Sequence, residues 1–519
     1  MKRFIYLMLC MLLTNFAWSQ DLYVGSGAAI TTVPGILLFA GSNVSVDAGG
    51  SLTTTSDATA SGSFIVSGST TGNITYKRYI NDVNWHLVSA PVTDQSIPTF
   101  VGVSDNAVPK SGTTSNYAVS YYKNTNTAGN RWTYHNTVNT APENQETLTN
   151  FIAGQGYSMK KTAAGDYTFT GAMANADVSV TIPTTITTGA HLWSAIGNPF
   201  PSFLPVNTAS NAANLLVDNV GVLDPSFAFL YVWDGASYQP IGLSGTALQL
   251  APGQAFMVRA KSTSETFTFK KVLQNHNSGA ATFYKSSVSN PTISVRLTNG
   301  TLNKSANLEF LDSSTTGLDV GYDAGAYQDG TPSFSINTHL VSDSQGIDFT
   351  RQSLPTSSLD SEVAIPLSIN AGINEEVTFS VDTNNLPDGV SVYLEDALNN
   401  TFTNLTNASF KLKITAALSG IGRFYLRTSS GVLSTETNFA GAMVALYKTS
   451  NGTVKVTGLT SGSAATFSLF TVLGKEVLAT KFIAQNVQEI SLPASLSAGV
   501  YIVNVASDLG TFHKKIIIE

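Results

Sequence analysis

Residues 377–394 read Val-Thr-Phe-Ser-Val-Asp-Thr-Asn-Asn-Leu-Pro-Asp-Gly-Val-Ser-Val-Tyr-Leu, two short alternating stretches separated by turn-forming residues. Alternation of apolar and polar residues with a period of two is typical of strands that bury one face. The same alternation recurs along the chain, whereas apolar residues nowhere keep helical spacing over three clean turns. The chain is therefore predicted to be all-β and built from tandem β modules.

This pattern extends on both sides of the quoted stretch and ends where the composition changes. Further strands are predicted at residues 293–297, 308–311, 363–367 and 422–426. We interpret residues 279–428 as a β-sandwich, because turn-forming residues separate these strands. Residues 429–442 contain few large apolar side chains and are interpreted as a linker.

A repeat of about 100 residues precedes the predicted sandwich. Its two copies open on apolar stretches that a proline interrupts, Trp85-His-Leu-Val-Ser-Ala-Pro91 and Leu192-Trp-Ser-Ala-Ile-Gly-Asn-Pro199. Each copy continues with an aromatic strand, a polar turn and a Gly-Gln pair, at Gly154 and Gly253. These two glycines are expected to take a backbone conformation that other residues reach only at a cost. The duplicated β unit is predicted at residues 81–180 and 181–278.

Residues 20–80 precede the repeat and consist of short β-branched segments separated by Gly, Ser and Thr. Their regular spacing favours short strands stacked as a β-ladder, either a few turns of a β-helix or a small sheet. The alternative is a loosely ordered linker rich in Gly, Ser and Thr.

The first residues have the layout of a secretory signal peptide. Lys2 and Arg3 precede an apolar run from Phe4 to Leu13, and Ala17 and Ser19 put small residues before a cut after Ser19. The run is too short to be a permanent membrane anchor. Its removal also removes the one cysteine of the chain, so the mature protein is expected to be stable without disulfides. We predict a signal peptide over residues 1–19 and a location outside the cytoplasm.

The charge of the chain argues against nucleic acid as a partner. Lys and Arg number 27 against 34 Asp and Glu, for a formal net charge of −7, whereas nucleic-acid binding needs a basic face. Only 12% of the residues are charged, which is typical of extracellular β proteins coated with short polar side chains.

No catalytic motif stands out in the sequence, and the chain is predicted not to be an enzyme. The six histidines are scattered, with no pair at metal-ligand spacing. The adjacent acidic pairs Glu375-Glu376 and Glu395-Asp396 are poor candidates for a glycosidase pair, because neighbouring strand residues point to opposite faces. A secreted hydrolase with an unrecognised active site is the alternative.

An acidic, glycine-rich segment offers a candidate calcium site. Asp319, Asp323 and Asp329 alternate with glycines and could supply oxygen ligands for Ca²⁺. The spacing matches neither the EF-hand loop nor the nonapeptide repeat. The alternative is that Asp and Gly serve ordinary turns.

Four aromatic residues of the repeat are candidates for ligand binding. Trp132 and Tyr134 belong to the first copy, and Trp233 and Tyr238 belong to the second. Exposed rings on a β scaffold stack on sugars, but aromatic residues also dominate the packing of strands, so a role in the core is the alternative.

The last predicted module, residues 443–519, carries three motifs in order: Leu473-Gly-Lys-Glu-Val477, Leu496-Ser-Ala-Gly-Val-Tyr-Ile-Val503 and Lys514-Lys-Ile-Ile-Ile-Glu519. It resembles the type A C-terminal sorting domain of the type IX secretion system of Bacteroidetes. The resemblance implies a small, detachable Ig-like β-sandwich that directs export across the outer membrane, followed by attachment to surface lipopolysaccharide or release. The sorting motif it implies comprises Gly474, Lys475, Glu476, Gly499, Tyr501, Lys514 and Lys515.

The preceding part, from about residue 75 to about residue 430, is similar to large flavobacterial surface proteins of unassigned activity. The similarity rests on the two proline-interrupted stretches, the two Gly-Gln strands, Asp319-Val-Gly-Tyr-Asp323 and Gly422-Arg-Phe-Tyr-Leu426. It brings no catalytic residues with it.

These observations favour an exported cell-surface or secreted protein with a structural, adhesive or glycan-binding role. No cofactor is expected apart from the Ca²⁺ considered above. The expected partners are the type IX secretion machinery, surface lipopolysaccharide, and a glycan or matrix ligand.

Overall fold

The structure is a computed structural model in which strands dominate and the two described α-helices are short, which confirms the predicted all-β class. It divides into two compact units, Met1–Asp224 with Leu230–Ser286, and Pro225–Phe229 with Ser287–Glu519. The predicted signal peptide and almost all of the predicted linker lie outside the described residues. The described residues are 21–138, 142–183, 192–235, 237–277, 290–328, 332–360, 363–429, 445–448, 452–471, 475–485, 487–493, 496–497, 499–507 and 510–518.

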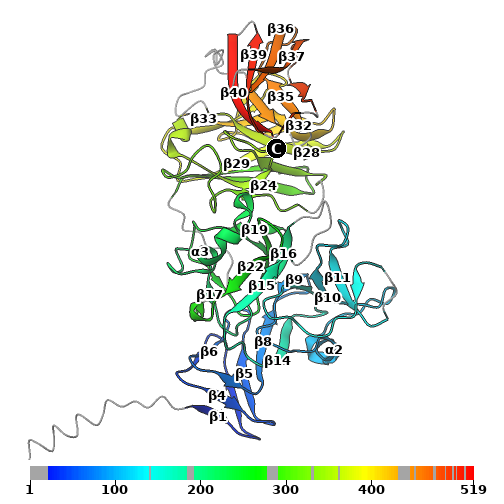
Figure 1. The fold of residues 1–519 in the computed structure, drawn as a ribbon, viewed down its shortest axis with the longest axis vertical. Coiled ribbons are helices and arrows are strands. Elements are labelled where there is room, and N and C mark those ends of the chain that lie inside the picture. The colour runs from blue at the N-terminus through cyan, green and yellow to red at the C-terminus, as the bar shows by residue number, and fades with distance from the viewer. Residues whose placement is uncertain are drawn as a thin grey trace, which may run out of the picture. The chain divides into compact units, whose positions relative to one another are not determined.

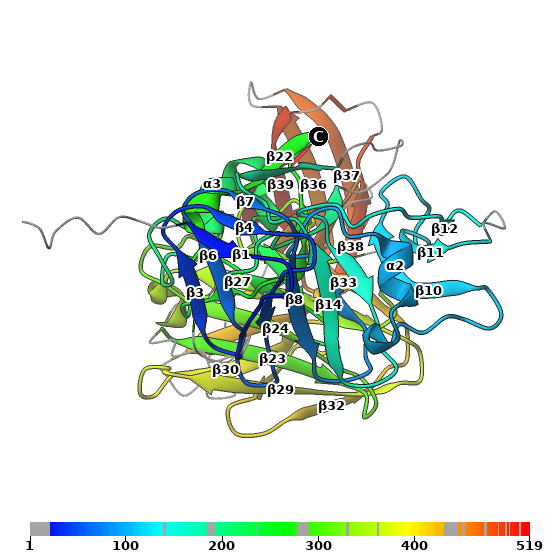
Figure 2. The ribbon, with the colours of Figure 1, turned by 90° about the horizontal axis from the view of Figure 1, so that it is seen from below.

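The first unit begins with a short parallel β-helix, the ordered structure predicted for this segment (blue strands in Figures 1 and 2). Successive coils pair in parallel, so that Val44 pairs with Leu22 and then with Thr70. Val24, Val46 and Phe64 are buried inside the stack. The three sides are β1 (Leu22–Val24), β4 (Val44–Val46) and β7 (Thr70–Thr71); β2 (Ala29–Thr32), β5 (Ser51–Thr55) and β8 (Ile74–Ile80); and β3 (Leu37–Ala40) and β6 (Ser63–Val66).

The first predicted copy of the repeat forms a five-stranded sheet in the order β12-β11-β10-β13-β9. A separate strand, β14, pairs antiparallel with β8 of the β-helix, so the β-helix and this copy share a sheet. Its elements are β9 (His86–Val88), α2 (Ile97–Gly102), η1 (Ser104–Asn106), β10 (Asn116–Tyr122), β11 (Trp132–Asn136), β12 (Gln145–Glu146), β13 (Tyr157–Met159) and β14 (Gly165–Gly171).

The second predicted copy has the order β19-β18-β21-β16, which matches β11-β10-β13-β9 of the first, and β15 pairs with β22 as β8 pairs with β14. The two sheets thus share one strand order, while the duplication itself stays a prediction. The elements are β15 (Val178–Ile182), β16 (Trp193–Gly197), β17 (Leu204–Pro205), α3 (Leu215–Asn219), η2 (Val220–Val222), β18 (Leu230–Trp233), β19 (Tyr238–Ile241), β20 (Gln249–Leu250), β21 (Ala255–Arg259), β22 (Glu265–Phe269) and η4 (Lys271–Leu273).

The two Gly-Gln turns are exchanged between the copies. Ser89, after β9, donates its N–H to the carbonyl of Gly253, and Gly197 of β16 donates to the carbonyl of Gly154, each at 2.9 Å. Gly154 has φ +79° and Gly253 has φ +67°, which confirms the backbone conformation predicted for both. A Cβ on Gly253 would lie 2.9 Å from the Ser89 carbonyl oxygen, so the close approach also requires glycine.

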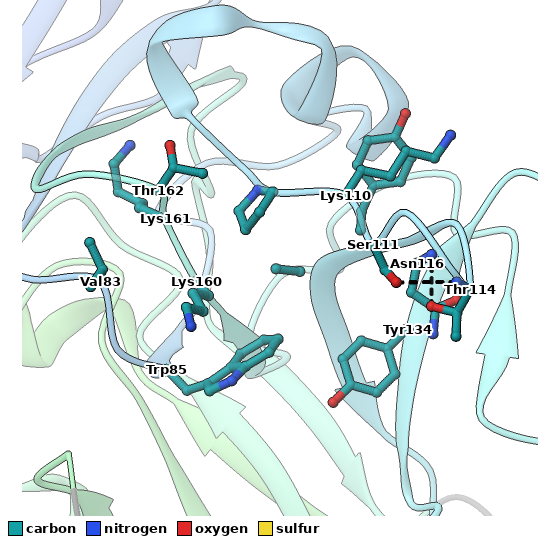
Figure 3. Close-up of a pocket in the computed structure, with 13 residues that line it drawn as sticks. Val83, Trp85, Lys110, Ser111, Thr114, Asn116, Tyr134, Lys160, Lys161 and Thr162 are labelled. Atoms are coloured by element: carbon teal, nitrogen blue, oxygen red, sulfur yellow. Dashed lines mark hydrogen bonds between the residues drawn. The ribbon is translucent and has the colours of Figure 1, made fainter.

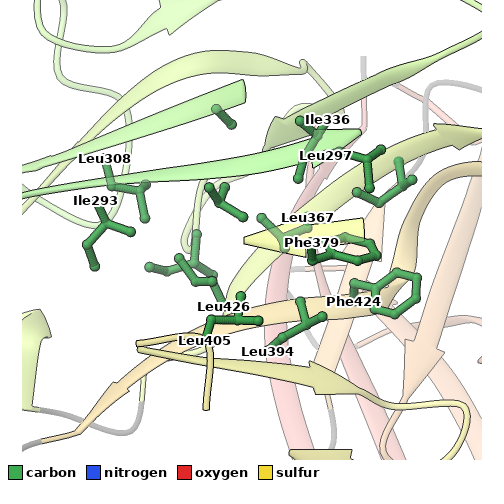
Figure 4. Close-up of a cluster of buried hydrophobic side chains, with 14 of the residues drawn as sticks. Ile293, Leu297, Leu308, Ile336, Leu367, Phe379, Leu394, Leu405, Phe424 and Leu426 are labelled. Atoms are coloured by element: carbon green, nitrogen blue, oxygen red, sulfur yellow. The ribbon is translucent and has the colours of Figure 1, made fainter. Parts of the chain in front are cut away.

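The second unit contains one long sheet that curls around a single apolar core (Figure 4). Its order is β31-β30-β33-β28-β26-β27-β24-β23-β29-β32, with β25 paired to β27. Phe379 of β29 and Phe424 of β33 are far apart in this order, yet their ring centroids lie 4.9 Å apart, because the sheet folds back on itself. The elements are β23 (Thr292–Thr298), β24 (Asn303–Phe310), β25 (Ala324–Gly325), β26 (Ser335–Thr338), β27 (Phe349–Leu354), η5 (Thr356–Asp360), β28 (Ile365–Ala371), β29 (Glu376–Asn384), β30 (Ser391–Asp396), β31 (Thr401–Asn404), β32 (Phe410–Lys413) and β33 (Leu418–Ser429). The short helix η3 (Pro225–Phe227) belongs to the same unit.

The C-terminal module packs two sheets face to face, with orders β34-β35-β38 and β37-β36-β39-β40. Val454 and Val456 from the first sheet and Phe467, Val503 and Ile516 from the second share one core. This is a small β-sandwich. Its strands are β34 (Ala445–Lys448), β35 (Thr453–Thr457), β36 (Ala464–Thr471), β37 (Glu476–Ile483), β38 (Val487–Ser491), β39 (Gly499–Ser507) and β40 (Gly510–Ile518).

Candidate functional site: an aromatic pocket with two lysines

A pocket of about 590 Å³ lies at the strand ends on one side of the five-stranded sheet of the first copy (Figure 3). The starts of β9 and β10 and the ends of β11 and β13 meet there, because these strands are antiparallel. The loop before β9 supplies Val83 and Trp85, and β11 supplies Tyr134. The segment leading into β10 and the residues after β13 complete the walls.

Two aromatic side chains form the main apolar surface of the pocket. The rings of Trp85 and Tyr134 meet edge to face, with centroids 6.0 Å apart and planes at 69°. Both side chains are half-buried, so part of each ring is open to a ligand. Burial raises the pKa of Tyr134, which keeps its phenol protonated at neutral pH. A neutral phenol beside an indole is a surface that stacks on sugar rings and donates hydrogen bonds.

Tyr134 is therefore the one predicted ligand-binding residue that lines this pocket. Trp85 was interpreted from the sequence as the start of a strand, and its role in the pocket was not predicted. Its indole lies in the loop ahead of β9, so it is not held between neighbouring strands. An aromatic residue directly before a short strand was the signal available in the sequence.

Three lysines line the same pocket, and they differ in what their ammonium groups do. Lys161 is buried and donates to the carbonyl oxygens of Asp105, Asn106 and Asp166, at 3.3, 2.7 and 2.7 Å. Burial lowers its pKa to about 8. Its ammonium thus satisfies backbone carbonyls of η1 and β14 and stabilises the fold.

Lys110 and Lys160 are more accessible. Lys110 is exposed, and its Nζ lies 5.0 Å from the ring centroid of Tyr117, a cation–π distance. Lys160 is half-buried and lies beside Trp85 in Figure 3. Within the described part of the chain, neither ammonium forms an ion pair.

The other three predicted aromatic residues form cross-strand pairs at the ends of two hairpins. Trp132 lies opposite Tyr122, with ring centroids 5.2 Å apart, and Trp233 lies opposite Tyr238, with centroids 5.0 Å apart. These four residues occupy matching positions in the two copies. Such pairs stabilise hairpins, and the structure does not bring Trp132, Trp233 or Tyr238 into the pocket.

The predicted calcium ligands divide between a turn and a buried position. Asp319 accepts hydrogen bonds from the N–H and hydroxyl of Thr315. Asp323 is buried and accepts the N–H groups of Asp319 and Ser353, each at 2.6 Å. Burial raises the pKa of Asp323 to about 7. Asp329 lies outside the described residues.

These hydrogen bonds to backbone N–H groups agree with the alternative considered from the sequence, in which the aspartates stabilise turns. Among the described residues, no group of three or more His, Asp, Glu or Cys side chains has a geometry that could hold a metal ion. Calcium binding by the acidic segment therefore stays a prediction.

Neighbouring carboxylates in the second unit are engaged by arginines. Glu395 accepts from Arg427 at 2.6 Å, and Asp396 accepts from Arg423 in a bidentate pair at 3.0 and 2.8 Å. All four residues lie on β30 and β33 or at their ends, where the ion pairs cross the strands. These contacts are structural.

The predicted sorting residues fall into two groups. Tyr501 is buried and donates its hydroxyl to the Ser497 carbonyl at 2.9 Å, and Lys514 donates to the Leu446 carbonyl at 3.0 Å. Lys475, Glu476 and Lys515 are exposed. Gly499 begins β39 and pairs with Ile518, while Gly474 lies outside the described residues.

In the described part of the chain, no helix combines the length and the apolar character needed to cross a membrane.

Comparison with known families gives two matches. Residues 449–519 match the secretion system C-terminal sorting domain, which implies export and contact with the type IX secretion machinery. This agrees with the resemblance of the last module. No curated protein matches the chain. Residues 10–427 match a family described as a domain of unknown function, a range that reaches further towards the N-terminus than the similarity seen from about residue 75. The chain thus belongs to the family Domain of unknown function (DUF8693) and carries a C-terminal sorting domain.

Proposed function

We propose that this exported protein is a non-catalytic glycan-binding protein of the outer cell surface or the secreted fraction, and that it binds sugar in the pocket of Trp85 and Tyr134. The single observation that carries this proposal is the half-buried edge-to-face ring pair, which leaves apolar ring surface beside a volume of about 590 Å³. A pocket of this size suits a mono- or disaccharide unit of a longer glycan.

The chemistry of the lining supports binding over hydrolysis. The described residues that line the pocket include no Asp or Glu side chain, whereas glycoside hydrolysis uses two carboxylates that flank the bond to be cleaved. Lys110 and Lys160 could orient a ligand, but neither lies next to a serine, histidine and acid arrangement that would activate a nucleophile.

Export gives this pocket access to extracellular glycans. The sorting domain accounts for delivery through the type IX machinery, and attachment to surface lipopolysaccharide or release would follow as the resemblance implies. A surface protein that holds a glycan would serve adhesion or the capture of polysaccharide.

A glycan array and a whole-cell binding assay with the full chain test the proposal, with release of hydrolysis products measured in the same wells. We expect saturable binding that Trp85→Ala lowers by about two- to tenfold, since one stacked ring contributes on the order of 0.5–1.5 kcal/mol. Phe39→Ala is the matched control, because it removes a ring that is 57% exposed elsewhere in the same unit. Steady product release, or binding that Trp85→Ala leaves unchanged, would contradict the proposal.

A further inference from the structure

The two copies of the repeat allow each pocket residue to be compared with its counterpart. In the first copy Tyr157 pairs with Val88, and in the second Phe256 pairs with Ile196. Tyr157 and Phe256 each lie three residues after the glycine of the Gly-Gln pair in their copy. This common register makes Trp85 the counterpart of Trp193, Lys160 the counterpart of Arg259, and Ser120 the counterpart of Tyr231.

The tryptophans have opposite environments. Trp193 is 1% exposed, and its ring packs edge to face on Tyr231 with centroids 4.8 Å apart and planes at 87°. The first copy has the small side chain of Ser120 in place of that tyrosine. Its tryptophan, Trp85, lines the pocket and contacts Tyr134 instead.

The cations differ in the same way. Arg259 forms an ion pair with Asp224, with 3.2 Å between Nε and Oδ2. Its counterpart Lys160 forms none within the described residues, and neither does Lys110 on the other part of the rim. The second copy neutralises its cation internally, whereas the first copy leaves two positive charges at the pocket.

One carboxylate adjacent in sequence to the pocket wall has other partners. Asp82, ahead of Val83, accepts from His86 at 2.8 Å and from the N–H of Asn84 at 2.7 Å. The pocket lining holds no Asp or Glu, and among the described residues neither Lys110 nor Lys160 forms an ion pair.

We infer that the pocket binds an anionic saccharide, with Lys160 and Lys110 on its carboxylate or sulfate and with Trp85 and Tyr134 against the sugar ring. This inference rests on the proposed function and names its substrate class. Lys160 is half-buried beside the aromatic wall, so its charge is less screened by water than that of a fully exposed lysine, and Lys110 adds a second positive charge at the rim.

Titration of the full chain with three oligosaccharides of equal length tests the inference, with Trp fluorescence and calorimetry as readouts. One oligosaccharide is neutral, one carries uronate carboxylates and one carries sulfates. We expect at least one anionic ligand to bind about tenfold tighter than the neutral one in low salt, with the difference shrinking in high salt. Comparing the titrations with the uronate and the sulfated oligosaccharide shows which anionic group the pocket binds.

Lys110→Met and Lys160→Met should each weaken binding of the anionic ligand by about three- to tenfold and weaken binding of the neutral ligand less. Methionine keeps the apolar stem, and Lys304→Met, which removes an exposed lysine of the second unit, is the control for net charge. If a variant fails to fold, the salt dependence of anionic-ligand binding by the unmodified chain still shows whether positive charges at the pocket contribute.

Equal affinity for neutral and anionic ligands would overturn the anionic specificity and leave the proposed glycan binding in place. Loss of anionic binding to the same extent in Lys304→Met would also overturn it, since the effect would then come from net charge. Failure of all three ligands and of the glycan array would overturn both proposals.

Discussion

The rings of Tyr425 and Tyr447 lie with their centroids 5.8 Å apart, and both side chains are buried. Tyr425 belongs to β33 of the long sheet, and Tyr447 belongs to β34 of the C-terminal module. The Tyr425 hydroxyl also shares a hydrogen bond with the Thr457 hydroxyl at 2.9 Å. The sorting module was expected to be detachable, and within the second unit this small apolar contact joins it to its neighbour.

Tyr447→Ala should uncouple the sorting module from the long sheet. Removing a buried aromatic side chain costs roughly 3 kcal/mol, and the loss falls on the contact between the two modules. We expect differential scanning calorimetry to show an additional, earlier transition in this variant. Tyr447→Phe keeps the ring and should leave the transitions of the unmodified chain, so the same splitting in both variants would argue against the packing explanation.

The two adjacent lysines of the sorting motif should have separable roles. Lys514 satisfies the Leu446 carbonyl and lies 5.4 Å from the Tyr447 ring centroid, whereas Lys515 is exposed on the other face of β40. Lys514→Met should lower the stability of the second unit by about 1–3 kcal/mol, because it leaves a carbonyl without its donor. Lys515→Ala should leave stability unchanged and reduce the amount of protein at the cell surface.

Surface delivery is measured by immunoblotting of intact cells and culture medium, and stability by urea unfolding. Lys411→Ala, at another exposed lysine of the second unit, is the control. Normal delivery of Lys515→Ala together with a stable Lys514→Met would show that neither assignment holds.

Gly253→Ala should destabilise the first unit more than an alanine at an open glycine. Gly253 has φ +67°, and a Cβ there would lie 2.9 Å from the Ser89 carbonyl oxygen, so both strain and a close contact oppose the substitution. We expect a loss of roughly 2–4 kcal/mol. Gly129 has φ +82° and nothing within 4 Å of an added Cβ, so Gly129→Ala should lower the free energy of unfolding by only about 1 kcal/mol. Equal losses in urea unfolding would mean that the exchanged turn adds nothing.

The all-β class and the Gly-Gln turns could be predicted because period-two alternation and a Gly in a fixed place are local signals. Phe379 and Phe424 show the limit of such signals. Each lies in a segment whose alternation predicts a strand, but only the curl of the long sheet brings the two rings to 4.9 Å. Curl accumulates from twist over many strand pairs, so no single segment encodes it.

The pocket was predicted in part for the same reason. Tyr134 was predicted because it is aromatic. Trp132, two positions away on the same strand, is aromatic too, yet it packs against Tyr122 in a hairpin pair. Trp85 was missed because residue type does not tell an open tryptophan from a covered one: Trp85 lines the pocket, whereas its counterpart Trp193 is 1% exposed and packs on Tyr231. The distinction between pocket and core thus depends on a tertiary neighbour.

Asp323 offers a test of the acidic segment that separates structure from metal binding. The buried carboxylate accepts two backbone N–H groups, so Asp323→Ala should cost about 2–3 kcal/mol by leaving both unsatisfied. The cost should be the same in Ca²⁺ and in excess chelator if the hydrogen bonds are the whole role. A melting temperature of the unmodified chain that rises with Ca²⁺, and that Asp323→Ala makes insensitive to Ca²⁺, would instead support the predicted calcium site.

The stability of the first unit should fall in mild acid because of His135. This side chain is buried, and its Nδ1 accepts the N–H of Leu148 at 3.1 Å, so it is held in the neutral form. Burial, and then the charge of Lys110, lower the pKa of His135. Below the unfolded-state pKa of about 6.5 the unfolded chain takes up a proton that the folded chain resists, so unfolding becomes easier as the pH falls.

Urea unfolding of the full chain between neutral pH and about pH 5 measures this effect, which can reach about 1.4 kcal/mol per pH unit for one proton. Lys110→Met should reduce the acid sensitivity, because removing the nearby charge brings the folded pKa closer to the unfolded value while the Leu148 hydrogen bond stays. His135→Phe should give a flatter dependence on pH at a lower overall stability. If the first unit in the unmodified chain and in both variants responds equally to acid, the titration of His135 is not the cause.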